Sequence, residues 1–120
     1  MNAYHQAQTA YAPATAPVRT DRSVEYEAIA RITRHIKQAD ENRSLVTALH
    51  ENRRLWTILA VDVAGNDNAL PEALRAQLFY LAEFTFQHTS KVIAGKADRD
   101  VLIEINTAVM KGLRSAKEAA

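Results

Sequence analysis

Apolar residues recur every three or four positions through four stretches of the chain. These positions are Ile29, Ile32, Ile36 and Ala39; Leu45, Leu49, Trp56, Leu59 and Val63; Leu74, Leu78, Leu81 and Val92; and Leu102, Ile105, Val109 and Leu113. The spacing follows the period of an α-helix, and no stretch alternates every second residue as a half-buried strand does. The pattern predicts four amphipathic helices over about residues 23–40, 44–64, 71–94 and 98–116.

Residues that favour helix ends lie at the borders of these stretches. Ser44, Asn68 and Asp98 have side chains that accept hydrogen bonds from the free N–H groups of a helix N-terminus. Gly65 and Gly95 tolerate the left-handed backbone conformation in which many helices end. Because the links between the helices are short, the sequence predicts an all-α fold, a compact four-helix bundle.

Residues 1–20 do not share the helical pattern. They are rich in Ala, Thr, Gln and Pro, and Pro13 and Pro17 interrupt any helix in this segment. We expect a flexible N-terminal arm, followed by a helical domain over residues 21–117. Tyr4 and Tyr11 either dock this arm on a partner or on the domain itself, or the arm is an untethered tail.

Two asparagines, Asn52 and Asn106, interrupt the apolar stripes of the second and fourth helices. At about 100° per residue, each falls on the apolar face of its helix. An unpaired buried amide costs about 1–3 kcal/mol, so each should have a partner. Three interpretations stay open: the amides fix the helix register by bonding to each other or to a loop, they cap neighbouring segments, or they face a groove for a partner helix. Trp56 likewise anchors either the core or such a groove.

Several large apolar side chains lie beyond a single stripe, which leaves apolar surface for a partner. They are Phe79, Phe84, Phe86 and Met110, and we take them as candidates for lining a partner-binding groove. Arg53 flanks the stripe beside Asn52. It either pairs with acidic residues of a partner or lies in solvent.

Composition excludes several kinds of site. The chain has 120 residues, 48% of them hydrophobic and 24% charged, which is typical of one globular domain. It has no cysteine, and therefore no disulfide or thiolate metal site. The glycines stand singly, the histidines form no metal-binding pair, and no serine lies in a nucleophile-elbow motif. We expect no catalytic site, no metal ion and no cofactor.

Charge and hydropathy narrow the class of partner. The formal net charge is +1, so no overall field attracts nucleic acid or a membrane surface. The basic run "RITRHIK" (residues 31–37) is either a solvated helix face or a phosphate-contacting stripe, and acidic residues at its ends favour the first. No apolar run approaches the roughly 20 residues of a membrane span, and the N-terminus lacks signal-peptide features. We expect a cytoplasmic protein that binds neither membrane nor, directly, nucleic acid.

Three short motifs resemble one family of bacterial proteins. They are "NRRLW" at residues 52–56, "NALP" with "LRAQL" at 68–78, and "IEINTAVMKGL" at 103–113. Their order and spacing resemble the FlaF family of alphaproteobacterial flagellar biosynthesis regulators, and "AYHQAQ" and "RSVEYEAIARITRHI" fit the family as well. The resemblance covers about residues 3–113, so we expect the helical domain over residues 21–117 to be FlaF-like.

The resemblance implies a non-enzymatic role in making flagellin. Members of the FlaF family are described as promoting flagellin synthesis or secretion, together with the translational regulator FlbT. They are thought to bind flagellin as a chaperone before export. The partners implied are therefore flagellin and FlbT. The alternative is an adaptor or post-transcriptional regulator of flagellin mRNA translation, which acts through FlbT or RNA without binding flagellin.

Overall fold

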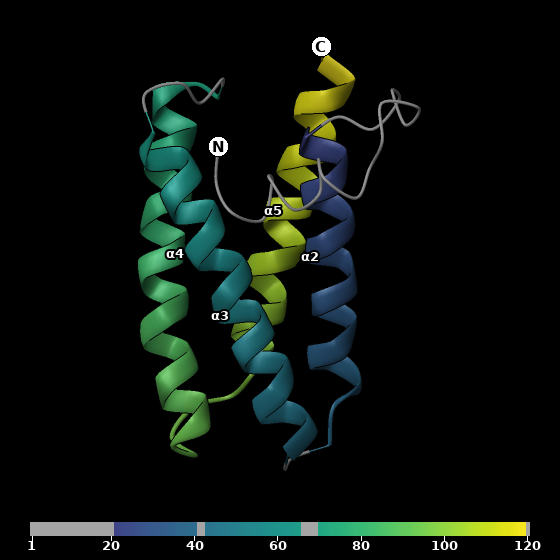
Figure 1. Ribbon diagram of the computed structural model, residues 1–120, viewed down its shortest axis with the longest axis vertical. Coiled ribbons are helices and arrows are strands. Elements are labelled where there is room, and N and C mark those ends of the chain that lie inside the picture. The colour runs from purple at the N-terminus through teal and green to yellow at the C-terminus, as the bar shows by residue number, and fades with distance from the viewer. Residues whose placement is uncertain (1–20, 41–42, 66–69, 120) are drawn as a thin grey trace.

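Four helices make up the computed structural model, which describes residues 21–40, 43–65 and 70–119, with side chains at 25–40, 44–65 and 70–112. They are α2 (Asp21–Gln38), α3 (Arg43–Ala64), α4 (Glu72–Ile93) and α5 (Asp100–Ala119). Successive helices run in opposite directions, as Figure 1 shows. The described residues contain no strand, and the predicted all-α four-helix fold is confirmed. The predicted arm, with Tyr4 and Tyr11, and the predicted cap Asn68 lie outside the described residues.

Helices α2, α3 and α5 bury most of the described positions of their predicted apolar stripes, and α4 buries two of its four, with Leu74 and Leu81 half-buried. The buried members are Ile29, Ile32, Ile36, Leu49, Trp56, Leu59, Val63, Leu78, Val92, Leu102 and Val109. On α4 the buried line differs from the prediction, because it also includes the small residues Ala82, Thr85 and Thr89. Small side chains let helix axes approach closely, and α3 and α4 form the most extensive helix–helix contact of the bundle.

Two arginines close the carboxyl ends of helices from neighbouring segments. Arg99, just before α5, donates from Nη1 to the backbone oxygens of Ile36 (2.9 Å) and Ala39 (2.6 Å) at the end of α2. Arg75, in the first turn of α4, donates to the backbone oxygen of Gly65 after α3 at 3.3 Å. Each cation meets the negative end of a helix dipole and satisfies carbonyl groups that lack intrahelical partners.

Gly95 and Asp98 act as the sequence predicts. Gly95 has a φ of 75°, and the N–H of Lys96 bonds to the backbone oxygen of Lys91 at 2.8 Å, which is the pattern of a left-handed helix end. Asp98 Oδ1 accepts the backbone N–H of Asp100 at 2.8 Å. That bond caps the N-terminus of α5.

Ser44 and Gly65 differ from their predicted roles. Because α3 already begins at Arg43, Ser44 lies inside the first turn, where its Oγ accepts the backbone N–H of Asp40 at 2.9 Å. Gly65 does follow the end of α3, but among the described residues only Gly95 has a positive φ. The arginine bond from α4 to the Gly65 carbonyl closes this helix in place of a left-handed glycine.

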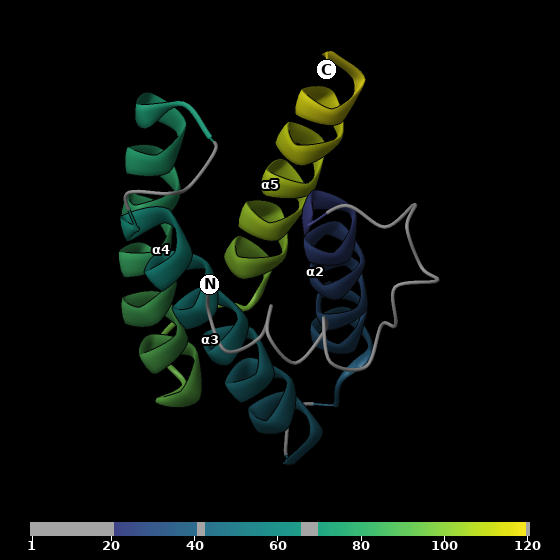
Figure 2. The same cartoon turned by 45° about the horizontal axis from the view of Figure 1, so that its top comes forward.

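The bundle is open along one seam. Helices α4 and α5 contact each other much less than the pairs α2–α3, α3–α4 and α2–α5 do. Figure 2 shows α4 and α5 separating toward the end of the bundle where α5 finishes. The apolar sides that α4 and α5 turn toward this seam are therefore only partly covered.

We predict that Arg99→Leu lowers the free energy of unfolding by about 2 kcal/mol, because two backbone oxygens at the end of α2 lose a charged donor. Denaturant titration followed by the fluorescence of Trp56, the single tryptophan, measures this change. Arg31→Leu, on the exposed face of α2, is the matched control and should leave stability nearly unchanged. Equal effects of the two substitutions would contradict the capping role.

Candidate functional site

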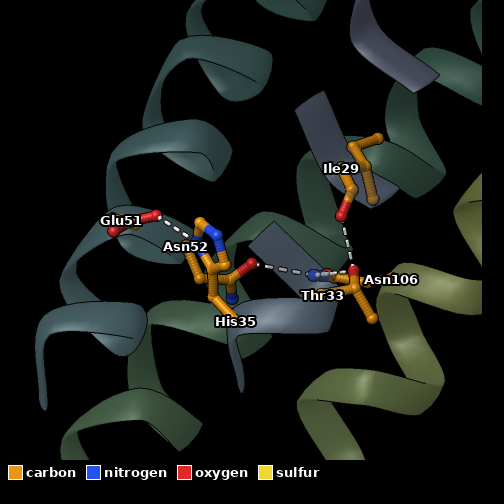
Figure 3. Close-up of polar contacts among 6 residues, drawn as sticks. All are labelled: Ile29, Thr33, His35, Glu51, Asn52 and Asn106. Carbon is orange, nitrogen blue, oxygen red and sulfur yellow. Dashed lines mark hydrogen bonds and ion pairs between the residues drawn. The ribbon is translucent and has the colours of Figure 1, made fainter. Parts of the chain in front are cut away.

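Hydrogen bonds converge on Asn106 of α5 at the centre of the bundle. Its Oδ1 accepts the indole N–H of Trp56 at 2.9 Å, and its Nδ2 donates to Asn52 Oδ1 at 2.8 Å and to Thr33 Oγ1 at 3.1 Å. Thr33 donates in turn to the backbone oxygen of Ile29 at 2.6 Å (Figure 3). The three larger side chains are 0% exposed and Thr33 is 3% exposed, so this network is fully buried. Asn106 thus connects α5 to both α2 and α3.

Trp56 fixes the orientation of both amides. An indole nitrogen can only donate, so Asn106 must turn its oxygen toward Trp56 and its NH₂ group toward the other two partners. Asn52 then meets an N–H group and must present its oxygen. The Nδ2 of Asn52 has no hydrogen-bond partner among the described residues. Asn106 therefore uses both ends of its amide, whereas Asn52 uses one.

The two asparagines face each other in the core, as the first of the three sequence interpretations supposed. Both lie in the interior of long helices, away from the ends where a cap would act. Trp56, bonded to Asn106 and 0% exposed, belongs to the same buried network. None of these three side chains is accessible to a partner in this conformation.

Polar groups outside the buried network include a surface pair between α2 and α3. His35 Nδ1 and Glu51 Oε2 lie 3.0 Å apart and join α2 to α3 beside Asn52 (Figure 3). Both side chains are more than 40% exposed, so water and salt weaken this interaction. Within the described residues, no three His, Cys, Asp or Glu side chains are placed to hold a metal ion. No helix there is long and apolar enough to cross a membrane.

The open seam between α4 and α5 holds an apolar groove. It encloses about 160 Å³ and is lined by Leu74, Gln77, Leu78 and Leu81 of α4 and by Ala108, Val109 and Gly112 of α5. None of the seven side chains is charged. A methyl group on Gly112 would meet no described neighbour within 4 Å. Glycine inside a helix lowers stability by about 0.5–1 kcal/mol relative to alanine. No contact among the described residues explains why glycine occupies this position in spite of that cost.

Phe84 continues this groove along α4. It follows Leu81 by three residues and Gln77 by seven, so it lies on the same edge of the helix. Its ring stacks on that of His88, with centroids 5.6 Å apart and planes inclined by 13°. Nε2 of His88 lies 2.8 Å from the backbone oxygen of Asp98 and therefore donates to it. The apolar edge thus extends from the groove to the loop before α5.

A known protein family matches most of the chain. The family described as "Flagellar protein FlaF" matches residues 7–113. The chain belongs to the FlaF family. The match includes α2, α3, α4 and most of α5, so the buried network and the groove both lie within the FlaF region. No curated protein and no solved structure matches the chain. Family membership makes this a flagellar protein.

The FlaF fold does not bring the four predicted groove residues together. Phe79 and Phe84 are 44% and 38% exposed, whereas Phe86 and Met110 are half-buried against the core. Phe79 and Phe86, seven residues apart, share one edge of α4, and Phe84 lies about 140–160° around the helix from them. Met110 lies about 160° around α5 from Gly112. Only Phe84 adjoins the groove.

Arg53 is not among the residues that line the groove of this FlaF protein. It is half-buried, and its Nη2 donates to Ser90 Oγ of α4 at 3.4 Å, a long hydrogen bond. Arg53 therefore joins α3 to α4 in this structure instead of standing free for an acidic partner.

Sequence reasoning missed one network residue and most of the groove in this FlaF chain. Thr33 lies four residues after Ile29 and three before Ile36, so its place on the apolar stripe was a usable signal. The groove residues Ala108 and Gly112 are small, and a helical wheel alone gives no reason to select them. Their role depends on the distance between α4 and α5, which the sequence does not contain.

We predict that Asn106→Leu lowers the free energy of unfolding by about 2–4 kcal/mol, because it leaves the Trp56 N–H and the Asn52 amide buried without partners. Asn52→Leu removes a donor that is already unpaired, so stability should stay the same or rise. Thermal and denaturant unfolding of both variants measures the difference.

The double variant Asn52→Leu/Asn106→Leu adds an internal control. It should be more stable than Asn106→Leu alone, because the second substitution removes an amide that the first has orphaned. If Asn52→Leu costs as much as Asn106→Leu, the unequal roles assigned to the two amides are wrong.

Proposed function

We propose that this FlaF-family protein is a non-enzymatic chaperone that binds flagellin in the cytoplasm before export. It thereby promotes flagellin synthesis and secretion for flagellum assembly, together with FlbT. The observation that carries this proposal is the uncharged groove between α4 and α5. Membership of a flagellar family supports flagellin as the partner.

The shape of the groove suits an amphipathic helix. Such a helix places apolar side chains at i, i+3 or i+4 and i+7 into a hydrophobic groove. Leu74, Leu81 and Phe84 follow one another along one edge of α4, and Ala108 and Gly112 let a guest backbone approach α5. The terminal segments of flagellin, amphipathic and disordered before assembly, are the segments we expect to bind here.

Release at the export gate requires that binding be reversible. The groove is short and half-open, and Gln77 adds a polar group to its wall. A disordered segment that folds on binding also loses conformational entropy, which lowers the affinity for a given contact area. We therefore expect micromolar affinity, tight enough to prevent premature polymerisation and weak enough for transfer.

We predict that Ala108→Arg weakens flagellin binding at least tenfold, because it places a long charged side chain in the apolar groove. Ala108 is exposed, so the fold should tolerate the change. Thr107→Arg, at the adjacent exposed position outside the groove, is the matched control and should bind as the unaltered protein does. Calorimetry with purified flagellin measures both affinities.

FlbT is offered in the same experiment, alone and together with flagellin. Equal flagellin binding by both arginine variants would exclude the groove as its site. Capture of FlbT alone would replace the chaperone proposal by that of an adaptor.

We predict that Phe84→Ser and Phe86→Ser separate binding from stability. Phe84 adjoins the groove and is 38% exposed, so its loss should weaken flagellin binding and change the melting temperature little. Phe86 packs against the core, so its loss should lower the melting temperature by several degrees. Calorimetry and thermal unfolding on both variants measure the two effects, and unfolding by Phe84→Ser would assign that ring to the core.

A second candidate function is regulation of flagellin mRNA through direct RNA contact. The observation that favours it is the exposure of Arg31, Arg34 and Lys37 along one stretch of α2. Phosphate contacts release counterions, so RNA binding should fall steeply between low and moderate salt, whereas groove binding should not. A gel-shift titration against salt therefore separates the two functions.

A further inference from the structure

Residues 1–18 have a composition that matches the groove. They contain no Asp, Glu, Lys or Arg, although such residues make up 24% of the chain, and they include Tyr4, Tyr11 and several alanines. The groove lining is likewise uncharged. We propose that this N-terminal segment occupies the α4–α5 groove of its own chain in the free protein, with Tyr11 as its main anchor.

The point of attachment lies at the correct end of the bundle. Residue 21 begins α2 at the end where α4 also begins and α5 finishes (Figure 1). The groove lies toward this same end, because its lining comes from the first turns of α4 and the middle of α5. The segment therefore joins the bundle at the end where the groove lies and need not travel along the length of the bundle.

The length of the segment is sufficient. Tyr11 precedes Asp21 by ten residues, which span up to about 33–36 Å when extended. Neighbouring helix axes are about 8–10 Å apart, and the groove lies on the side of α5 away from α2. The reach thus exceeds the two helix spacings that Tyr11 must cross.

Two further observations favour this occupant over an unrelated peptide. The FlaF family match begins at residue 7, so most of the segment belongs to the family pattern and is no extraneous tail. Gly112 leaves open space on the groove wall, and an extended backbone held back from helix formation by Pro13 and Pro17 can use it. Attachment to the same chain also gives a high effective concentration, so even a weak contact is populated.

The inference concerns the free protein and holds whether or not flagellin is the external partner. Occupation of the groove would multiply the apparent association constant for any partner by the fraction of time that the groove is free, and so lower it. The segment would thus act as an internal competitor that a partner must displace.

A spin label on the segment tests its position in the full chain. Because the chain has no cysteine, Thr9→Cys provides a unique site for a nitroxide label. Amide NMR signals of Gln77, Leu81 and Gly112 should lose several-fold in intensity relative to the reduced label. The amide of Val61, 60% exposed on α3, should keep its intensity.

Matched variants of the labelled protein make the assignment specific. Tyr11→Ser and Gly112→Leu should each restore the groove signals, the first by removing the anchor and the second by filling the open space. Lys111→Leu, at an exposed neighbouring position of α5, should leave the broadening unchanged. The remaining amide signals of each variant report directly whether the bundle is folded.

The outcomes are decisive in either direction. Broadening confined to the groove and removed by Gly112→Leu supports the proposal. Broadening that is uniform, absent from the groove or unaffected by Gly112→Leu overturns it. Broadening in a mixture of labelled and isotope-enriched chains at the same concentration would place the segment in the groove of a second copy, which also overturns occupation within one chain.

Discussion

The indole N–H of Trp56 sets the geometry on which the rest of the bundle depends. It is wholly buried and can be satisfied only by an acceptor, which Asn106 supplies. Because the amide is planar, its NH₂ group then points to Thr33 and Asn52 and ties α5 to two helices at one height. A slide or rotation of α5 by one residue would break all three bonds together, at about 1–3 kcal/mol for each group left unpaired. An apolar stripe alone would tolerate such a shift far better, since hydrophobic cores can repack.

Helix α4 takes no part in these hydrogen bonds, and the groove follows from that difference. It is held to α3 by close packing of Ala82, Thr85 and Thr89, each 0% exposed. Helix α5 is held instead to α2 and α3 through Asn106. The bond from His88 to the Asp98 carbonyl joins α4 only to the loop before α5, and the two helices themselves make few contacts. The seam between them therefore keeps apolar walls that only partly cover each other. The seam between α4 and α5 thus presents hydrophobic surface in a recess.

Periodicity in the sequence was sufficient for the fold and for the two asparagines in the core. A stripe depends only on residues within one helix, so Asn52 and Asn106 stand out as exceptions in the sequence alone. The order of the helices around the bundle cannot be predicted in this way. A helical wheel gives the angle of each residue about the axis of its own helix and does not say which other helices are adjacent. For this reason the choice among three roles for the asparagines needed the structure. Large apolar side chains beyond a single stripe do not predict the groove, because its α5 wall includes small residues such as Ala108 and Gly112.

Asn52 occupies a position where leucine would suit an isolated amphipathic helix, and stability does not account for it. Its oxygen pairs with one N–H of Asn106, yet its own NH₂ group remains without a partner among the described residues. A leucine there would orphan the Asn106 N–H and remove the Asn52 donor, so the number of unpaired groups would not increase. Asn52 instead specifies how α3 is rotated toward α5. In a rotated packing its amide would meet only apolar side chains, so such packings are disfavoured. By disfavouring those packings, it helps keep α5 in the position that leaves the seam with α4 open.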